Sequence, residues 1–185
     1  MWTVARSELI LGGQRSGKSR RAESLAAVWL AQSPRHQAVL IATGQAHDSE
    51  MRERIAQHQR DRALRVPGLL TVEEPLHLDL AIPTHSRPDT LLVLDCLTLW
   101  LTNHLMPASG VAGEPPIAAL LQALRAAPGP VVLVGNEIGL GVIPMGREVR
   151  HFVDTLGRLN QEVARACERV AFMAAGLPLT LKGSP

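Results

Sequence analysis

The segment Glu8–Ser19, with the sequence ELILGGQRSGKS, joins a short strand-like run to a glycine-rich loop. The run Glu8–Leu11 is typical of a buried strand, and the helix-like segment Lys18–Ala31 follows the loop. Residues Gly12–Ser19 match G-x-x-x-x-G-K-[ST], the phosphate-binding loop, in the strand, loop and helix order that this motif requires. A chance match is expected in about one chain in a thousand, so we favour a phosphate loop over a fortuitous glycine-rich turn.

The residue types in this loop have defined chemical roles. Glycines at 12 and 17 allow a tight turn that points backbone N–H groups inward, and the helix start adds positive dipole where phosphates would lie. Lys18 would bridge the outer phosphates, and Ser19 would place its hydroxyl on Mg²⁺. Lysine is scarce, since Lys18 and Lys182 are the only two, which strengthens the interpretation of Lys18.

The apolar runs elsewhere predict a mostly parallel sheet. They lie at Glu8–Leu11, Ala38–Ala42, Leu69–Val72, Thr90–Asp95, Val131–Gly135 and Val170–Ala175. The runs are continuously apolar instead of alternating, as expected of strands covered on both faces. We therefore expect a single-domain, three-layer α/β fold over residues 1–185, of the P-loop NTPase (RecA-like) type, with helices on both faces of the sheet.

Helical segments are predicted between these runs. Besides Lys18–Ala31, they are Ser49–Arg62, Ile117–Arg125 and an amphipathic helix through Phe152, Leu156, Leu159 and Val163. Proline and glycine mark loops at Pro107–Pro116 and Ala126–Pro130, and Leu177–Lys182 could add a terminal strand.

Composition excludes several classes of protein. The 185 residues carry 19 Lys+Arg and 17 Asp+Glu, a balance too even for nucleic-acid binding. No apolar run approaches the roughly 18 residues that span a bilayer, so we expect a cytoplasmic protein. Cys96 and Cys167 lie in apolar segments without metal-ligand spacing and are interpreted as core thiols. We expect no exposed apolar patch.

Two further residues could carry chemistry. Asp95 ends an apolar strand, where it could coordinate Mg²⁺ with Ser19 or simply cap a helix. His58 shares one helical stripe with Ile55 and Arg62, so we expect it to face the body of the protein. It could act as a nucleophile toward phosphorus or be a packing residue, and its spacing alone favours packing.

Several motifs together resemble one family, the bifunctional adenosylcobinamide kinase/adenosylcobinamide-phosphate guanylyltransferases of cobalamin biosynthesis. The main ones are G-G-x-R-S-G-K-S at Gly12–Ser19, I-A-T-x-Q at Ile41–Gln45 and R-I-x-x-H at Arg54–His58. Others are Asp95–Thr98, Asn136–Gly139, Gly141–Pro144, Gly157–Gln161 and Gly176–Pro178. The resemblance covers nearly the whole chain, from about Glu8 to Lys182.

The resemblance implies two reactions: phosphorylation of adenosylcobinamide by ATP or GTP, then transfer of GMP from GTP through a GMP-histidine intermediate at His58. It implies Mg²⁺ as cofactor and a homotrimer. The phosphate cradle would be Gly12, Gly13, Gln14, Arg15, Ser16, Gly17, Lys18 and Ser19. The remaining nucleotide contacts would be Thr43, Gly44, Gln45, Gln59, Arg60, Asp61, Arg62, Glu73 and Asp95.

The chain departs from the family pattern beside the histidine. His47 replaces an apolar residue, Ser49 replaces an acid, and Ala63 stands where a proline commonly follows the arginine. These changes concern substrate fit and the geometry of the loop beside the nucleophile. Two alternatives also remain open: a P-loop kinase in which His58 is structural, and a regulatory protein that uses nucleotide binding as a switch. The role of Asn136 and Glu137, which follow a strand on the expected ligand edge, also stays open.

Overall fold

The computed structural model describes residues 4–46, 49–108 and 110–184, without the side chains of Glu50, Met51 and Arg54; the departure at His47 lies outside this range. The strands are β1 (Ser7–Gly12), β2 (Gln37–Ala42), β3 (Leu69–Glu73), β4 (Thr90–Asp95), β5 (Val131–Val134), β6 (Arg169–Ala174) and β7 (Leu177–Lys182). The helices are α1 (Lys18–Gln32), α2 (Ser49–Arg65), α3 (Leu78–His85), α4 (Leu97–Leu105), α5 (Ile117–Ala126) and α6 (Arg147–Ala166).

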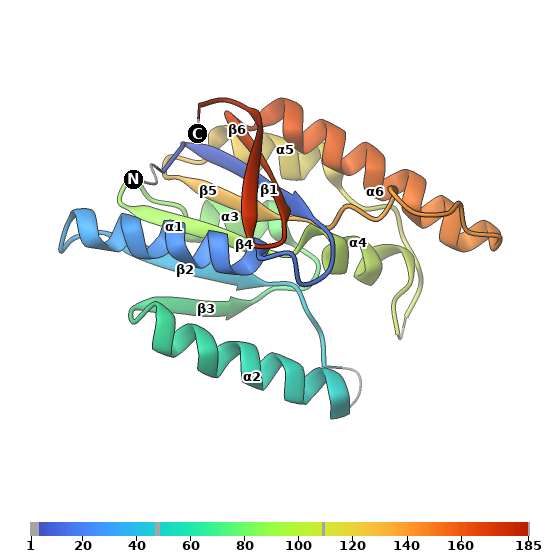
Figure 1. The fold of residues 1–185 in the computed structure, drawn as a ribbon, viewed down its shortest axis with the longest axis horizontal. Helices are drawn as coiled ribbons and strands as arrows, with labels where there is room; N and C mark the ends of the chain where they lie inside the picture. The colour runs from blue at the N-terminus through green and yellow to red at the C-terminus, as the bar shows by residue number, and fades with distance from the viewer. Residues whose placement is uncertain (1–3, 47–48, 109, 185) are drawn as a thin grey trace.

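The seven described strands form one sheet in the order β3-β2-β4-β5-β1-β6-β7. Strands β1 to β6 pair in parallel, and β7 returns antiparallel along β6 as the final hairpin (Figure 1). The carboxyl ends of β1, β2 and β4 consequently meet at one edge of the sheet. This is the edge at which open parallel sheets bind ligands.

Both faces of the sheet are covered. Leu25 and Ala26 of α1 pack with Ile10, Leu40 and other strand residues on one face. On the other face α3, α4, α5 and α6 pack against the alternate strand residues. Helix α2 lies beyond the outer strand β3, at the opposite end of the sheet from the β6–β7 hairpin (Figure 1).

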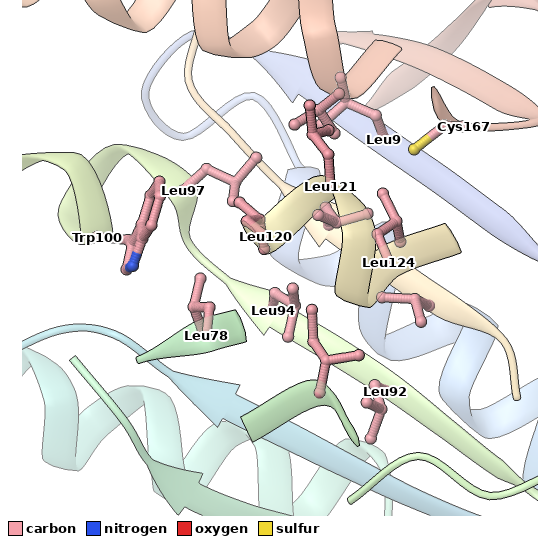
Figure 2. Packing of buried hydrophobic residues seen from close by; sticks show 14 of the residues in the cluster. Leu9, Leu78, Leu92, Leu94, Leu97, Trp100, Leu120, Leu121, Leu124 and Cys167 are labelled. Carbon is pink, nitrogen blue, oxygen red and sulfur yellow. The ribbon is translucent and has the colours of Figure 1, made fainter. Parts of the chain in front are cut away.

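The larger core cluster forms under α5. Leu120, Leu121 and Leu124 point from one side of this helix toward Leu9 and Leu94 of the sheet (Figure 2). Each completely buried leucine contributes about 1.5–3 kcal/mol of transfer free energy. The spacing of the three leucines on one helical stripe therefore fixes how α5 packs on the sheet.

A buried ion network fixes α1 relative to β1. Glu8 on β1 is fully buried, and its carboxylate contacts Arg21 of α1 at 2.8 Å and Arg169 of β6 at 3.2 Å. Because a buried carboxylate is costly without such partners, the network restricts the helix that follows the phosphate loop to one position.

The structure confirms the α/β class and every predicted strand, including the terminal one. The predicted helices are also present, with α2 continuing to Arg65 and α6 beginning at Arg147. Helices α3 and α4 were not predicted individually, since they are short and α3 contains Pro83. Among the described residues, no helix is both long enough and apolar enough to cross a bilayer.

Candidate nucleotide-binding site

The phosphate loop turns tightly between β1 and α1. Gly12 and Gly17 have φ angles of 149° and 104°, which side-chain-bearing residues rarely adopt. A Cβ atom on Gly12 would lie 2.5 Å from the carbonyl oxygen of Met173 and 2.7 Å from Ser16 Oγ. Glycine at position 12 is therefore required by both backbone geometry and space.

Two neighbouring segments donate backbone hydrogen bonds to the loop. The backbone N–H of Gly176, in the β6–β7 turn, donates to the carbonyl oxygen of Ser16 at 3.0 Å. The N–H of Glu137, just after β5, donates to the carbonyl oxygen of Gly12 at 3.2 Å. These two contacts engage carbonyl oxygens of the loop and not its N–H groups, which are the groups that bind an anion in a loop of this type.

Lys18 lies across its own loop. Its Nζ donates to the carbonyl oxygen of Gly13 at 2.6 Å, and the residue is 8% exposed. Burial lowers the pKa of Lys18, while the nearby Cys96 and Asp95 oppose that shift. The ammonium is thus already placed at the loop, where it can donate to a phosphate oxygen.

Asp95 faces the start of α1 from the end of β4. Burial raises the pKa of Asp95, and four groups oppose this: Arg62, His58, a hydrogen bond from Ser19, and Lys18. The hydroxyl of Ser19 and the carboxylate of Asp95 are therefore adjacent oxygen donors beside the phosphate loop. Mg²⁺ prefers such oxygen ligands, so the pair fits the predicted metal position.

Thr43 binds the loop after β2 to the end of β4. Its Oγ1 donates to the carbonyl oxygen of Cys96 at 2.8 Å and accepts from the N–H of Cys96 at 2.9 Å. The side chain is completely buried, and Asn103 of α4 donates to the Thr43 carbonyl oxygen at 2.8 Å. In this structure the hydroxyl positions the residue next to Asp95 and is not presented to a ligand.

Helix α2 carries the predicted nucleophile. Arg62 is buried and Ile55 half-buried, but His58, which shares their stripe, is exposed to solvent. The sequence predicted that His58 faces the body of the protein; its ring is not buried there, because α2 lies beyond the outer strand β3. His58 nevertheless lies close enough to Asp95 and Glu23 to influence the pKa of both carboxyl groups.

Most of the other predicted nucleotide contacts are exposed. Gly13, Gln14, Arg15, Gln45, Gln59, Arg60 and Glu73 are exposed. Arg60 donates to Gln57 at 2.8 Å, and Gln57 donates to Asp61 at 2.6 Å, so these side chains pair along the helix. Gly44 lies between α4 and α2, since a Cβ there would be 3.4 Å from Leu99 and 4.0 Å from Ile55.

Glu23 was not predicted from the sequence as a site residue, but it lies beside Arg62 and interacts electrostatically with Asp95 and His58. It is 3% exposed on α1 and forms ion pairs with Arg62 and Arg65 of α2. The available signal was an acidic residue within the small apolar stretch Ala22–Ala27, on the helix that follows the phosphate loop.

The segment after β5 combines anchored and exposed residues. The N–H of Asn136 donates to Thr98 Oγ1 at 2.9 Å, and Asn160 of α6 donates to the Asn136 carbonyl oxygen at 3.1 Å. Beyond this anchor, Val142 and Met145 are almost completely exposed, beside a cavity of about 650 Å³ between residues 138–144 and α6. The expectation of no exposed apolar patch is wrong, since Val142, Ile143 and Met145 are exposed. The sequence did not reveal them because they lie on an irregular loop, where apolar residues follow no helix or strand period.

These features define a P-loop nucleotide-binding protein of the α/β class: a phosphate loop follows the central parallel strand β1, and an acidic residue ends β4, which is separated from β1 by β5. Residues 8–181 match the family described as cobinamide kinase / cobinamide phosphate guanyltransferase. The chain therefore belongs to this family, whose enzymes are kinases and nucleotidyltransferases.

Individual relatives align with this chain over nearly their whole length. The chain is 49% identical to the bifunctional adenosylcobalamin biosynthesis protein CobP of Pseudomonas aeruginosa, covering 96% of this chain and 98% of the relative. It is 38% identical to the bifunctional adenosylcobalamin biosynthesis protein CobU of Escherichia coli, covering 94% and 98%. The CobU protein of Salmonella typhimurium is 37% identical with the same coverage.

Proposed function

We propose that this protein phosphorylates adenosylcobinamide with ATP or GTP and then transfers GMP from GTP through His58, giving adenosylcobinamide-GDP in cobalamin biosynthesis. Family membership supports the two activities. The observation that carries the site is the gathering of Lys18, Ser19, Asp95, Arg62 and His58 at one edge of the sheet.

In the first reaction the loop amides and Lys18 would hold the nucleotide phosphates. A hydroxyl oxygen of the corrinoid attacks the γ-phosphorus and its proton passes to solvent, while the bond to the β-phosphate oxygen breaks and the nucleoside diphosphate leaves with that electron pair. Ser19 and Asp95 would hold Mg²⁺, which when bound neutralises charge on the phosphates.

In the second reaction the neutral imidazole of His58 attacks the α-phosphorus of GTP. A P–N bond forms, the α–β P–O bond breaks, and pyrophosphate leaves with the electron pair while the ring proton passes to solvent. A phosphate oxygen of the phosphorylated corrinoid then attacks the same phosphorus, the P–N bond breaks, and the imidazole of His58 leaves with that electron pair and regains a ring proton from solvent. The solvent-exposed position of His58 leaves its ring accessible to both substrates.

The remaining nucleotide contacts are proposed from the family motifs. They are Thr43, Gly44, Gln45, Gln59, Arg60, Asp61, Arg62 and Glu73. Arg62 has the strongest support, since it is buried on the side of α2 that faces Asp95 and would add positive charge near the transferring phosphorus. Thr43 would act through the loop that its hydroxyl holds in place.

We further propose a homotrimer in the cytoplasm. Val142, Ile143 and Met145 form an exposed apolar surface of the kind that subunit contacts cover. Cys96 and Cys167 are free buried thiols, which suits a reducing compartment. Sedimentation velocity on the purified chain measures the oligomeric state directly.

The decisive test is covalent labelling with α-³²P-GTP and Mg²⁺, followed by denaturing electrophoresis. We expect a label that is lost in acid, stable in alkali and absent from His58→Ala, as a phosphoramidate requires. His77→Ala is the matched control, because His77 is also exposed and makes no side-chain cap hydrogen bond. A wild-type protein that binds GTP without becoming labelled would contradict the guanylylation step and favour a simple kinase or a nucleotide switch.

A further inference from the structure

One carboxylate connects the helix of the phosphate loop to the helix of His58. Glu23 lies on α1, five residues after Lys18. Its Oε1 is 3.7 Å from Arg62 Nε and its Oε2 is 3.1 Å from Arg65 Nε. Both arginines belong to the last turns of α2, so this contact joins the two helices.

Two of the three side chains in this contact are buried, and the third is partly exposed. The side chains of Glu23 and Arg62 are 4% and 9% exposed, whereas that of Arg65 is 42% exposed. Burial raises the pKa of Glu23, and the charges of Arg65 and Arg62 oppose that shift most strongly. A buried carboxylate with two guanidinium partners is strongly destabilised when its partners move away, so it resists separation of the helices.

The rest of α2 offers few comparable attachments among the described residues. Arg62 Nη1 donates to Thr71 of β3 at 3.2 Å, and the buried Val66 follows the helix. Leu64 is 84% exposed, and the polar residues of the middle turns face solvent. The anchored part of α2 is therefore its C-terminal end, where Glu23 makes its contacts.

The geometry of α2 makes this anchor relevant to His58. His58 precedes Arg62 by four residues and so lies one turn away on the same side of the helix. Arg62 and His58 both interact electrostatically with Asp95, at the mouth of the phosphate loop. Fixing Arg62 therefore fixes the direction in which His58 projects.

Among the described atoms, Glu23 Oε2 and Arg62 Nε are buried without a hydrogen-bond partner. The ion pairs are thus close but not aligned as hydrogen bonds, and an N–O separation of 3.7 Å exceeds the usual range for such bonds. The contact therefore holds α2 by the attraction of opposite charges.

We propose that Glu23 is a positioning residue for guanylylation, which holds Arg62 and Arg65 so that α2 presents His58 to the phosphate loop. This role rests on the proposed function, because it acts through His58. It predicts that loss of the Glu23 charge impairs transfer to His58 far more than it impairs phosphate binding or the kinase reaction.

The test compares Glu23→Gln with Glu53→Gln, which removes the same charge from an exposed position on α2. The rate of His58 labelling by α-³²P-GTP is measured at saturating GTP, together with the GTP dissociation constant and the γ-phosphate transfer rate. Misplacement of a reacting group by about 1 Å costs up to about 100-fold. For E23Q we expect labelling slowed by about 10- to 100-fold, with GTP affinity and kinase rate changed less than about threefold.

Hydrogen exchange supplies a readout independent of catalysis. In E23Q we expect faster exchange of α2 amides, with α1 and β1 unchanged, and E53Q should match the wild type. Arg65→Gln removes only the half-exposed partner, so it preserves folding if E23Q does not, and it should slow labelling by a smaller factor. Glu23→Asp keeps the charge and should recover part of the labelling rate.

The outcomes separate the two proposals. Wild-type labelling with equally fast labelling in E23Q and R65Q would overturn the role of Glu23. An equal fall of labelling, kinase rate and GTP affinity in E23Q would also overturn it, because that pattern indicates general disruption. No label on the wild type would overturn the proposed guanylylation itself and, with it, this role of Glu23.

Discussion

The hydroxyl of Thr43 is predicted to stabilise the fold beside Asp95, and Thr43→Val removes it while nearly preserving side-chain volume. The substitution leaves the N–H of Cys96 without its acceptor, whereas the Cys96 carbonyl oxygen still accepts from Trp100 N at 3.1 Å. A buried N–H without a partner costs about 1–3 kcal/mol, and the lost donated bond adds about 1 kcal/mol. We expect Thr43→Val to lower the free energy of unfolding by about 2–4 kcal/mol.

Urea denaturation followed by circular dichroism measures this change. Thr43→Ser is the matched control, because it keeps the hydroxyl and loses only one buried methyl group, worth about 1 kcal/mol. MgGTP affinity should also fall in Thr43→Val, since Asp95 directly precedes Cys96. A Thr43→Val protein within 1 kcal/mol of the wild type, or more stable than Thr43→Ser, would refute the structural role assigned to this hydroxyl.

Two further predictions concern residues away from the nucleotide. Lys182 Nζ donates to the carbonyl oxygens of Ala164, Arg165 and Cys167 at the end of α6, so Lys182→Met should cost about 1–2 kcal/mol in urea denaturation, and an unchanged midpoint would contradict this. Burial raises the pKa of Cys167 from 9.0 to about 12. The unfolded thiol therefore ionises first, and the stability from its protonated form is complete below pH 9 and lost as pH rises toward 12. Between pH 8 and pH 10, Cys167→Ala should lose about 1 kcal/mol less stability than the wild type; parallel losses would count against the buried, protonated thiol.

The sequence predicted the elements whose signals are local. The loop Gly12–Ser19 was found because a phosphate loop needs particular residues at fixed spacing, and the strands were found because a strand covered on both faces is continuously apolar. Helices α3 and α4 escaped prediction, since short helices have too few turns for a periodic pattern to stand out.

The candidate site was predictable only in part. His58 was placed on the correct stripe of its helix, but its exposure depends on what lies opposite that stripe. Thr43 was assigned to nucleotide binding from its motif, while its hydroxyl is used by the backbone of Cys96, which lies 53 residues away in the sequence. Contacts over such separations leave no periodicity, so spacing could not reveal them.

By itself the sequence determined the class of fold, the phosphate loop and the family, because each depends on residue types at short, fixed spacings. The tertiary structure alone decided the strand order, which brings the ends of β1, β2 and β4 to one edge. It also decided that Glu23 meets Arg62 and Arg65, and that Lys182 caps α6. Such pairings arise from the packing of distant segments, whose position is set by burial of the whole core and not by any local pattern.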